Sequence, residues 1–190
     1  MAEDEYLTEI AVHDDMLRAY FALAGQRPQV AFAAIQAERL LPLYKGFVGA
    51  DTPSSGKMME GVEAAWRWLE TAAAPDPGLR EDCFRLIPDT EDHPDELGHA
   101  ASNAGSAIVG ALDLTHGSDA ISAISIGDLV IELYDAYAGQ AATREEIDRQ
   151  KSQVAEISEL YSSSNLIARL RERAANEALH WSQTGLCVGE

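Results

Sequence analysis

Apolar positions recur with the spacing of an α-helix along almost the whole chain. In residues 54–73 and 118–138 they fall at intervals of three and four, whereas the alternation typical of strands is almost absent. The first stripe comprises Met58, Val62, Ala65, Trp66 and Leu69, and the second comprises Ile126, Leu129, Val130, Leu133 and Tyr137. Ser54 or Ser55 is suited to cap the first of these helices, and Gly139 to end the second. The pattern therefore predicts helices rather than a sheet.

Further helices are expected over about 5–24, 77–87 and 97–116, and from Pro28 to Pro42, where a proline should kink or end the helix. The 97–116 segment has small residues at every third or fourth position, so we predict that it is the central, most buried helix. These small residues are Ala100, Ala104, Ala107 and Ala111.

A charged helix is expected from Thr143 to about residue 161, and the apolar stripe resumes at Ile167, Leu170, Ala174 and Trp181. The polar run at 162–165 either breaks this helix or only weakens it, and both alternatives stay open because serine costs a helix little. We therefore predict an all-α fold, a single-domain bundle of about six or seven helices over residues 1–190. Residues 1–27 would form an acidic N-terminal helical extension.

Length and composition indicate an ordinary globular protein. The chain has 190 residues, of which 46% are apolar and 24% charged, which suits one domain with a substantial core. No stretch approaches the roughly 18 consecutive apolar residues of a membrane helix. The N-terminus is acidic where a signal peptide is basic and then apolar, so we expect a cytoplasmic protein. Cys83 and Cys187 lie among apolar residues and are expected to be reduced and mostly buried.

The net charge of −18 is the most unusual feature of the composition. Residues 1–136 contain 24 acidic and 8 basic residues, and the remainder contains 8 and 6, so the first part carries nearly all of the excess. Such a surface repels phosphate groups, which disfavours binding to nucleic acid or to an anionic membrane. A basic protein partner is favoured instead, although a high net charge also serves solubility alone.

The acidic residues are densest in the segment LIPDTEDHPDE, residues 86–96. An EF-hand calcium loop is disfavoured because the segment has proline where flexibility is required and no glycine at the turn. One interpretation is a solvated connection in which Asp92 or Asp95 caps the following helix. The other is a surface that meets a basic partner, with Asp89, Glu91, His93 and Asp95 as contact residues.

Catalytic and metal-binding motifs are weak in this sequence. Glu96 with His99 and Glu177 with His180 each place a carboxylate and an imidazole on one helix face, as in di-iron bundles, and Glu38 and Glu132 would complete the set. Glu96, however, lies in the first turn of its helix, and the interval from Glu38 to Glu96 is longer than two adjacent helices require. No hydrolase or phosphate-binding motif occurs. His116, next to Gly117, is expected to serve as a helix C-terminal cap. We predict no enzyme activity, no cofactor and no metal.

Three segments resemble the bacterial family labelled domain of unknown function 416 (DUF416). They are AERLLPLYKGF at 37–47, VEAAWRWLE at 62–70 and LIPDTED at 86–92. The matching positions are Glu38, Arg39, Pro42, Tyr44, Trp66, Pro88 and Asp92. The resemblance covers most of the chain from about residue 28, and it implies an all-helical single domain without an established activity. Residues 1–27 and His93, where the family commonly has an aromatic residue, depart from that pattern.

Two functional hypotheses follow. The first is a non-enzymatic binding protein that masks a basic partner, most concretely an immunity or antitoxin-like protein, with Asp14, Asp15 and the acidic segment as contacts. The second is a signalling accessory or small-ligand-binding domain, associated with a histidine kinase, whose pocket is lined by Glu38, Arg39, Tyr44 and Trp66. The alternative for Glu38 and Arg39 is an ion pair that fixes helix packing. A di-iron metal protein is a third, weaker hypothesis.

Overall fold

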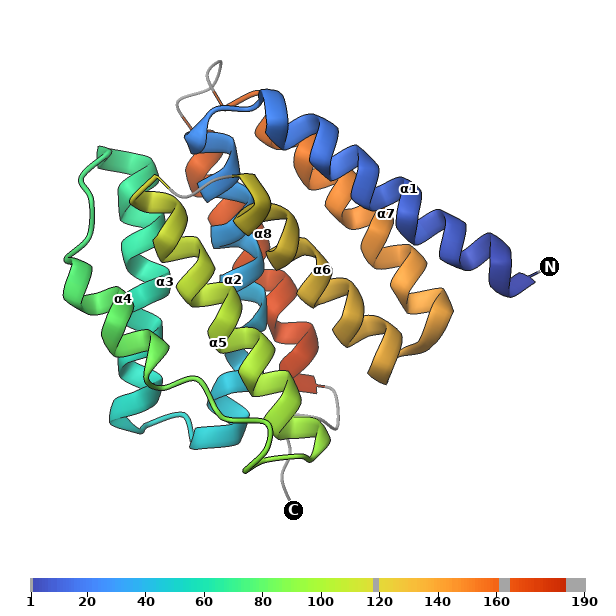
Figure 1. Cartoon of the computed structure of the whole chain (residues 1–190). Coiled ribbons are helices and arrows are strands. Elements are labelled where there is room, and N and C mark those ends of the chain that lie inside the picture. Colours follow the sequence, from blue (N-terminus) through green and yellow to red (C-terminus); the bar gives the residue numbers. More distant parts are fainter. Residues whose placement is uncertain (1, 118–119, 161–164, 184–190) are drawn as a thin grey trace.

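The computed structural model describes residues 2–117, 120–160 and 165–183, and in these residues it contains eight α-helices and no strand (Figure 1). The helices are α1 Ala2–Leu23, α2 Gln26–Val48, α3 Pro53–Thr71, α4 Pro77–Phe84, α5 Glu96–Thr115, α6 Ala120–Tyr137, α7 Gly139–Ile157 and α8 Leu166–Gln183. The all-α prediction is confirmed. The predicted number of six or seven is too low, because α7 ends at Ile157 and α8 begins as a separate helix at Leu166. Residues 161–164 lie outside the described part of the chain.

Helix starts are set by short polar side chains that accept hydrogen bonds from the first turn. Thr52, rather than the predicted Ser54 or Ser55, caps α3, because its side chain accepts from the backbone N–H of Ser55 and Pro53 occupies the first helical position. Asp76 caps α4 in the same way. Pro42 does not end its helix, as one of the two predicted alternatives had it, since α2 continues six residues further to Val48. A proline removes only one backbone donor, and tertiary packing holds the helix beyond it.

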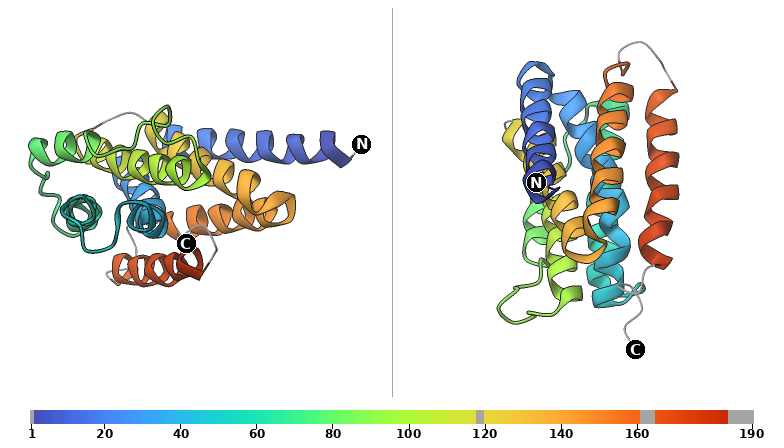
Figure 2. Two further views of the ribbon diagram at one scale, coloured as in Figure 1. Left: turned by 90° about the horizontal axis from the view of Figure 1, so that it is seen from below. Right: turned by 90° about the vertical axis from the view of Figure 1, so that its right-hand side faces the viewer.

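The helices form three layers, as the two views of Figure 2 show. α4, α5, α6 and α1 lie in one outer layer, α3, α2 and α7 lie in the middle, and α8 covers the opposite face. α2 packs against α5, α8, α3, α6 and α7, and every residue from Pro28 to Ala37 is buried. The central helix is therefore α2 and not the predicted 97–116 segment, because only the middle layer is covered on both faces.

α5 confirms the role expected of its small residues. Ala100, Ala104, Ala107 and Ala111 are all buried, and α5 lies along α2. His116 forms the C-cap of α5 as predicted, and its Nδ1 lies 3.0 Å from the carbonyl oxygen of Leu112.

α1 joins the outer layer through one face of the predicted N-terminal helix. Tyr6, His13, Leu17 and Phe21 are buried, and α1 packs against α6 and α7. Cys83 is a buried free thiol, as predicted, whereas Cys187 lies outside the described residues. Within the described part of the chain, no helix has both the length and the apolar character needed to span a membrane.

Candidate functional site

The connection between α4 and α5 contains the acidic loop, which we define as residues 89–96. The carboxylate of Asp89 accepts a hydrogen bond from the backbone N–H of Glu91 at 2.9 Å, and Asp95 accepts one from Gly98 at 2.7 Å as the N-cap of α5. The ring of His93 packs edge-on against Phe47, with the ring centroids 4.9 Å apart. Three of the four contact residues predicted in this loop thus have structural roles of their own.

The backbone of the acidic loop is held closely against the rest of the fold. A Cβ atom on Gly98 would lie 2.4 Å from the carbonyl oxygen of His93, so only glycine allows the loop to pack on the first turn of α5. The hydroxyl of Tyr44 on α2 donates to the carbonyl oxygen of Leu86 at 2.8 Å and anchors the start of the connection. The loop therefore presents its outward side chains from a fixed backbone.

Glu91 and Asp92 are the side chains of this loop that the turn itself does not use. Both are exposed, as is Glu96 in the first turn of α5, and none of the three has a cationic partner among the described residues. The end of α6 lies beside them: burial raises the pKa of Tyr137, and the negative charges of Glu96 and Asp95 raise it further. The acidic loop and the end of α6 therefore form one negatively charged end of the outer layer.

Asp14 and Asp15 lie elsewhere. They belong to α1, which Figure 1 shows at the upper right, whereas the acidic loop lies at the bottom of the molecule. Asp14 forms an ion pair with Arg18 at 2.9 Å, and Asp15 is exposed. Burial raises the pKa of Asp128 on α6 to about 6, and the charge of Asp14 adds to this shift. The contact residues proposed from the sequence therefore fall on two separate acidic patches.

Arg39 forms a buried ion pair that fixes helix packing, as the structural alternative expected, but its partners are not Glu38. Arg39 donates from both terminal nitrogens to Glu146 on α7, at 2.8 and 2.6 Å, and its Nε lies 2.8 Å from Glu177 on α8. Glu38 instead accepts a hydrogen bond from the indole N–H of Trp66 at 3.0 Å. Consecutive residues of a helix point about 100° apart, so their side chains meet different neighbours.

The predicted pocket residues Arg39, Tyr44 and Trp66 are at most 1% exposed, so their side chains belong to the core rather than to an open pocket. Arg39 lies in a buried polar network that the sequence analysis missed. Gln36 donates to Gln153 at 2.7 Å, and Gln150 donates to the carbonyl oxygen of Gly127 at 3.1 Å.

The Nε2 atom of His13 lies 2.9 Å from Oε1 of Gln150 and completes the link to α1. Because Oε1 of Gln150 is an acceptor, this nitrogen of His13 carries the proton. The available signal was the polar stripe on the buried face of α7, namely Thr143, Glu146, Gln150 and Gln153.

The four glutamates of the di-iron hypothesis do not converge. Glu38 bonds to Trp66, Glu177 pairs with Arg39, and Glu132 is exposed on α6. Among the residues that the structure describes, no group of three histidine, cysteine or acidic side chains could hold a metal ion. The side chain of His180 lies outside the described set. The structure gives this hypothesis no support.

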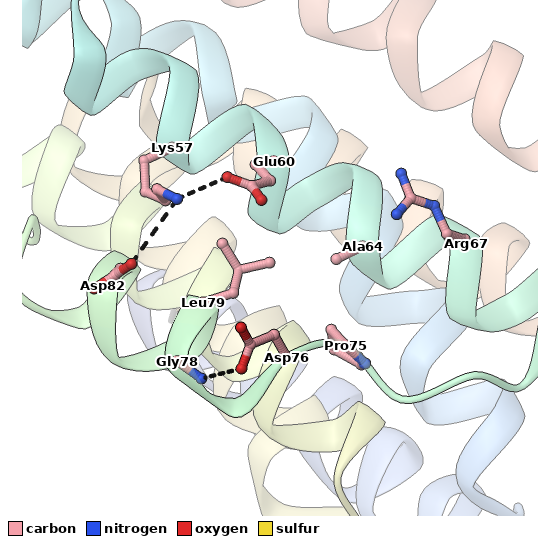
Figure 3. A pocket seen from close by; sticks show the side chains of 9 residues that line it. All are labelled: Lys57, Glu60, Ala64, Arg67, Pro75, Asp76, Gly78, Leu79 and Asp82. Carbon is pink, nitrogen blue, oxygen red and sulfur yellow. Dashed lines mark hydrogen bonds and ion pairs between the residues drawn. The ribbon is translucent and has the colours of Figure 1, made fainter.

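A pocket of about 260 Å³ lies between α3 and the start of α4 (Figure 3). Lys57, which lines the pocket, lies 2.8 Å from Glu60 and 3.9 Å from Asp82. Asp76 is held as the cap of α4, and Arg67 lies at the far end of the pocket in the view of Figure 3. Two positive and three negative groups surround this space, so it suits a small polar or zwitterionic molecule.

Comparison with solved structures identifies the fold. The structure matches the crystal structure of a DUF416 family protein from Shewanella baltica OS155 with a TM-score of 0.70, and the match covers 83% of this chain and 92% of that chain. The chain has the DUF416 fold. The sequence identity is 18%, so the likeness establishes the fold and carries no activity. No family model and no curated protein matches the sequence.

The DUF416 fold explains why the three resembling segments occur together. Glu38 of the first segment bonds to Trp66 of the second, and Tyr44 of the first bonds to Leu86 of the third. The segments therefore hold α2, α3 and the connection after α4 in place. Since these residues build the core, the outward side chains of the acidic loop are the better candidates for function.

Proposed function

We propose that this chain is a non-enzymatic binding protein that uses the acidic loop and the adjoining end of α6 to engage a basic protein partner. In its most concrete form, this is an immunity or antitoxin-like role in which the acidic end covers a cationic functional surface. The observation that carries the proposal is the presence of unpaired, outward carboxylates of Glu91, Asp92 and Glu96 on a well-anchored backbone.

The distribution of ion pairs supports this proposal. At least eleven of the fourteen basic residues form ion pairs within the chain, and in α7 and α8 most of the charge is balanced in this way. Few cations are therefore left to neutralise the acidic end. Complementary charge of this kind raises the rate of encounter with a basic surface and selects against acidic partners.

The test is an affinity capture from cells of the source organism, followed by mass spectrometry and by binding measurements with the purified partner. The double variant Glu91→Lys/Asp92→Lys reverses the charge of two side chains that the loop does not need for its structure. We expect this variant to slow association at least tenfold and wild-type binding to weaken steeply with salt, because surface charges are screened beyond about 10 Å at 0.1 M.

The matched control is Glu145→Lys/Glu172→Lys, which changes the net charge equally at two exposed positions on α7 and α8. Equal effects of the two double variants would show that net charge, and not the acidic loop, governs binding. A partner whose binding is indifferent to salt and to Glu91→Lys/Asp92→Lys would contradict the proposal.

The small-ligand alternative now rests on the pocket between α3 and α4 rather than on Glu38, Arg39, Tyr44 and Trp66. The supporting observation is the ring of five charged groups around a space of about 260 Å³. Thermal-shift screening with zwitterionic amino acids and small amines, repeated with Lys57→Met, tests this second function. Stabilisation by a ligand that Lys57→Met abolishes would support it, and an unchanged melting temperature across the set would count against it.

A further inference from the structure

An apolar groove of about 330 Å³ crosses the outer layer between α4, α5 and α6. Its apolar lining includes Phe84 at the end of α4, Val109 on α5 and Leu129 on α6. Phe84 is 52% exposed, although an aromatic ring of this size gains most when it is covered. The groove therefore leaves part of the apolar surface of this layer uncovered.

The exposed ring of Phe84 is held in place. The guanidinium carbon of Arg80 lies 5.0 Å from the ring centroid, within the range of a cation–π contact. Arg80 is itself fixed by Asp113 on α5 through hydrogen bonds of 2.9 and 3.2 Å. A preorganised ring of this kind loses little conformational entropy when a partner covers it.

Four small residues line the part of the groove between α5 and α6. Ser106 and Gly110 on α5 face Ser122 and Ser125 on α6. The two helices are in close contact below them, since a Cβ on Gly110 would lie 2.8 Å from Cδ1 of Ile126. Because these four residues are small, the backbone of a third helix can approach α5 and α6 at this point, as in helix-in-groove recognition.

One end of the groove runs towards the acidic loop. On α5, positions 110, 106, 103, 99 and 96 are spaced by three or four residues and share a face that ends at Glu96. On α6, Glu132 follows Leu129 by three residues, and the end of α6 lies beside Glu96 and Asp95. A molecule that fills the apolar groove and extends along this face therefore reaches the unpaired carboxylates.

We propose that the groove receives an amphipathic helix of the basic partner, with its apolar face on Phe84, Val109 and Leu129 and with lysine or arginine side chains towards Glu96 and Glu132. This inference rests on the proposed function, and it specifies that the partner binds through an amphipathic helix. The face from Asp113 to Glu96 spans 18 residues of α5 and is about 25 Å long, which fits a helix of four to five turns.

Charge selects a basic helix over a second copy of this chain. In a symmetric dimer through the same face, the carboxylates of both copies would share one interface, and like charges in contact are unfavourable. A basic helix instead places opposite charges there and covers Phe84 at the same time.

The experiment uses a fluorescein-labelled 16-residue peptide of leucine and lysine, with leucines at helical spacing, and a peptide of equal composition whose leucines are shuffled. Fluorescence anisotropy with the full chain should show at least tenfold tighter binding of the amphipathic peptide. Phe84→Ser removes the anchor and Ser125→Trp fills the groove, and each should weaken that binding about tenfold. Met59→Ser, which removes an exposed apolar side chain on α3, should leave it unchanged.

The outcomes separate this inference from the function on which it rests. If Glu91→Lys/Asp92→Lys weakens binding but Phe84→Ser and Ser125→Trp do not, the groove proposal is wrong. The proposed role of the acidic loop is then unaffected. The groove proposal would also be wrong if neither peptide bound and if the captured partner bound Phe84→Ser and Ser125→Trp as well as the wild type. Sedimentation that shows a dimer abolished by Ser125→Trp would assign the groove to a second copy instead.

Discussion

Arg39 on α2 and Glu146 on α7 form a two-point ion pair across 107 residues of sequence, and both side chains are at most 1% exposed. Two parallel N–H···O bonds satisfy the donors and acceptors that burial removes from water. Arg149 also pairs with Glu146, and Glu177 with Arg39, so the buried charges are balanced. The pair fixes α7 against α2, which are two of the three helices of the middle layer.

The first prediction concerns Glu146. Glu146→Ala leaves the guanidinium of Arg39 buried with Glu177 as its remaining carboxylate, and we expect a loss of about 3–5 kcal/mol of unfolding free energy. Urea denaturation followed by circular dichroism measures it. The neighbouring Glu145 is exposed, so Glu145→Ala should stay within about 0.5 kcal/mol of the wild type. Equal losses in the two variants would contradict the role assigned to the pair.

The pH dependence of the same pair has a definite sign. Burial alone would raise the pKa of Glu146, but the charge of Arg39 and its hydrogen bonds outweigh this and lower the pKa below the ordinary glutamate value. The stabilisation is therefore complete above the unfolded-state pKa and is lost as the pH falls through the lower folded-state pKa. We expect the stability difference between wild type and Glu146→Ala to shrink in acid, as measured by urea denaturation from pH 7 downwards.

The pKa of Asp128 is shifted in the opposite direction to that of Glu146, so its effect on stability has the opposite pH dependence. Burial, followed by the charge of Asp14, raises the pKa of Asp128 to about 6, so its ionised form costs stability at neutral pH. Asp128→Asn should stabilise the protein by an amount on the order of 1 kcal/mol at pH 7.5, discounted for the partial exposure of the group. The gain should shrink as the pH falls through 6 towards 4, because Asp128 is then protonated in the folded state. Differential scanning calorimetry tests this, with Asp15→Asn as the exposed control; a gain that is constant with pH would refute it.

The acidic loop should divide into structural and free carboxylates. Asp95→Ala removes the N-cap of α5 and is expected to cost about 1 kcal/mol, whereas Glu91→Ala removes only an exposed charge and should be close to neutral. A change of 1 kcal/mol shifts the melting temperature of a chain of this size by about 2–4 °C, which differential scanning fluorimetry resolves. A loss at Glu91 as large as that at Asp95 would mean that the loop depends on Glu91 for its shape.

Substitution of Gly98 tests how closely the acidic loop packs on α5, and Gly56 in α3 is the control. Gly98→Ala places a methyl group 2.4 Å from the carbonyl oxygen of His93, so the loop must move, and we expect a loss of about 1–3 kcal/mol. Gly56→Ala in α3 meets nothing within 4 Å and should stabilise by up to about 1 kcal/mol, because alanine is the better helix former. Chemical denaturation of both variants checks the contrast, and a neutral Gly98→Ala would show that the loop is not held where the structure has it.

The local sequence pattern was sufficient to predict the helices and some of their caps, but not how the helices are arranged in layers. The stripes in α3 and α6, the N-cap role of Asp95 and the cap at His116 follow from spacing and side-chain chemistry within a few residues, and each is confirmed. The position of α2 in the middle layer was missed, because both segments are rich in apolar residues and apolar content alone does not tell which helix is covered on two faces.

The sequence by itself determined an all-helical, strongly acidic chain with a cluster of carboxylates between α4 and α5, since periodicity and charge are properties of neighbouring residues. Only the tertiary structure decided that Arg39 meets Glu146 rather than Glu38, and that Asp14 lies apart from the acidic loop. It also decided that Asp89 and Asp95, but not Glu91 and Asp92, accept backbone hydrogen bonds within the connection. The physical reason is that a buried charge or a capped helix end is satisfied by whichever group packing brings within hydrogen-bond distance, and that group can lie anywhere in the chain.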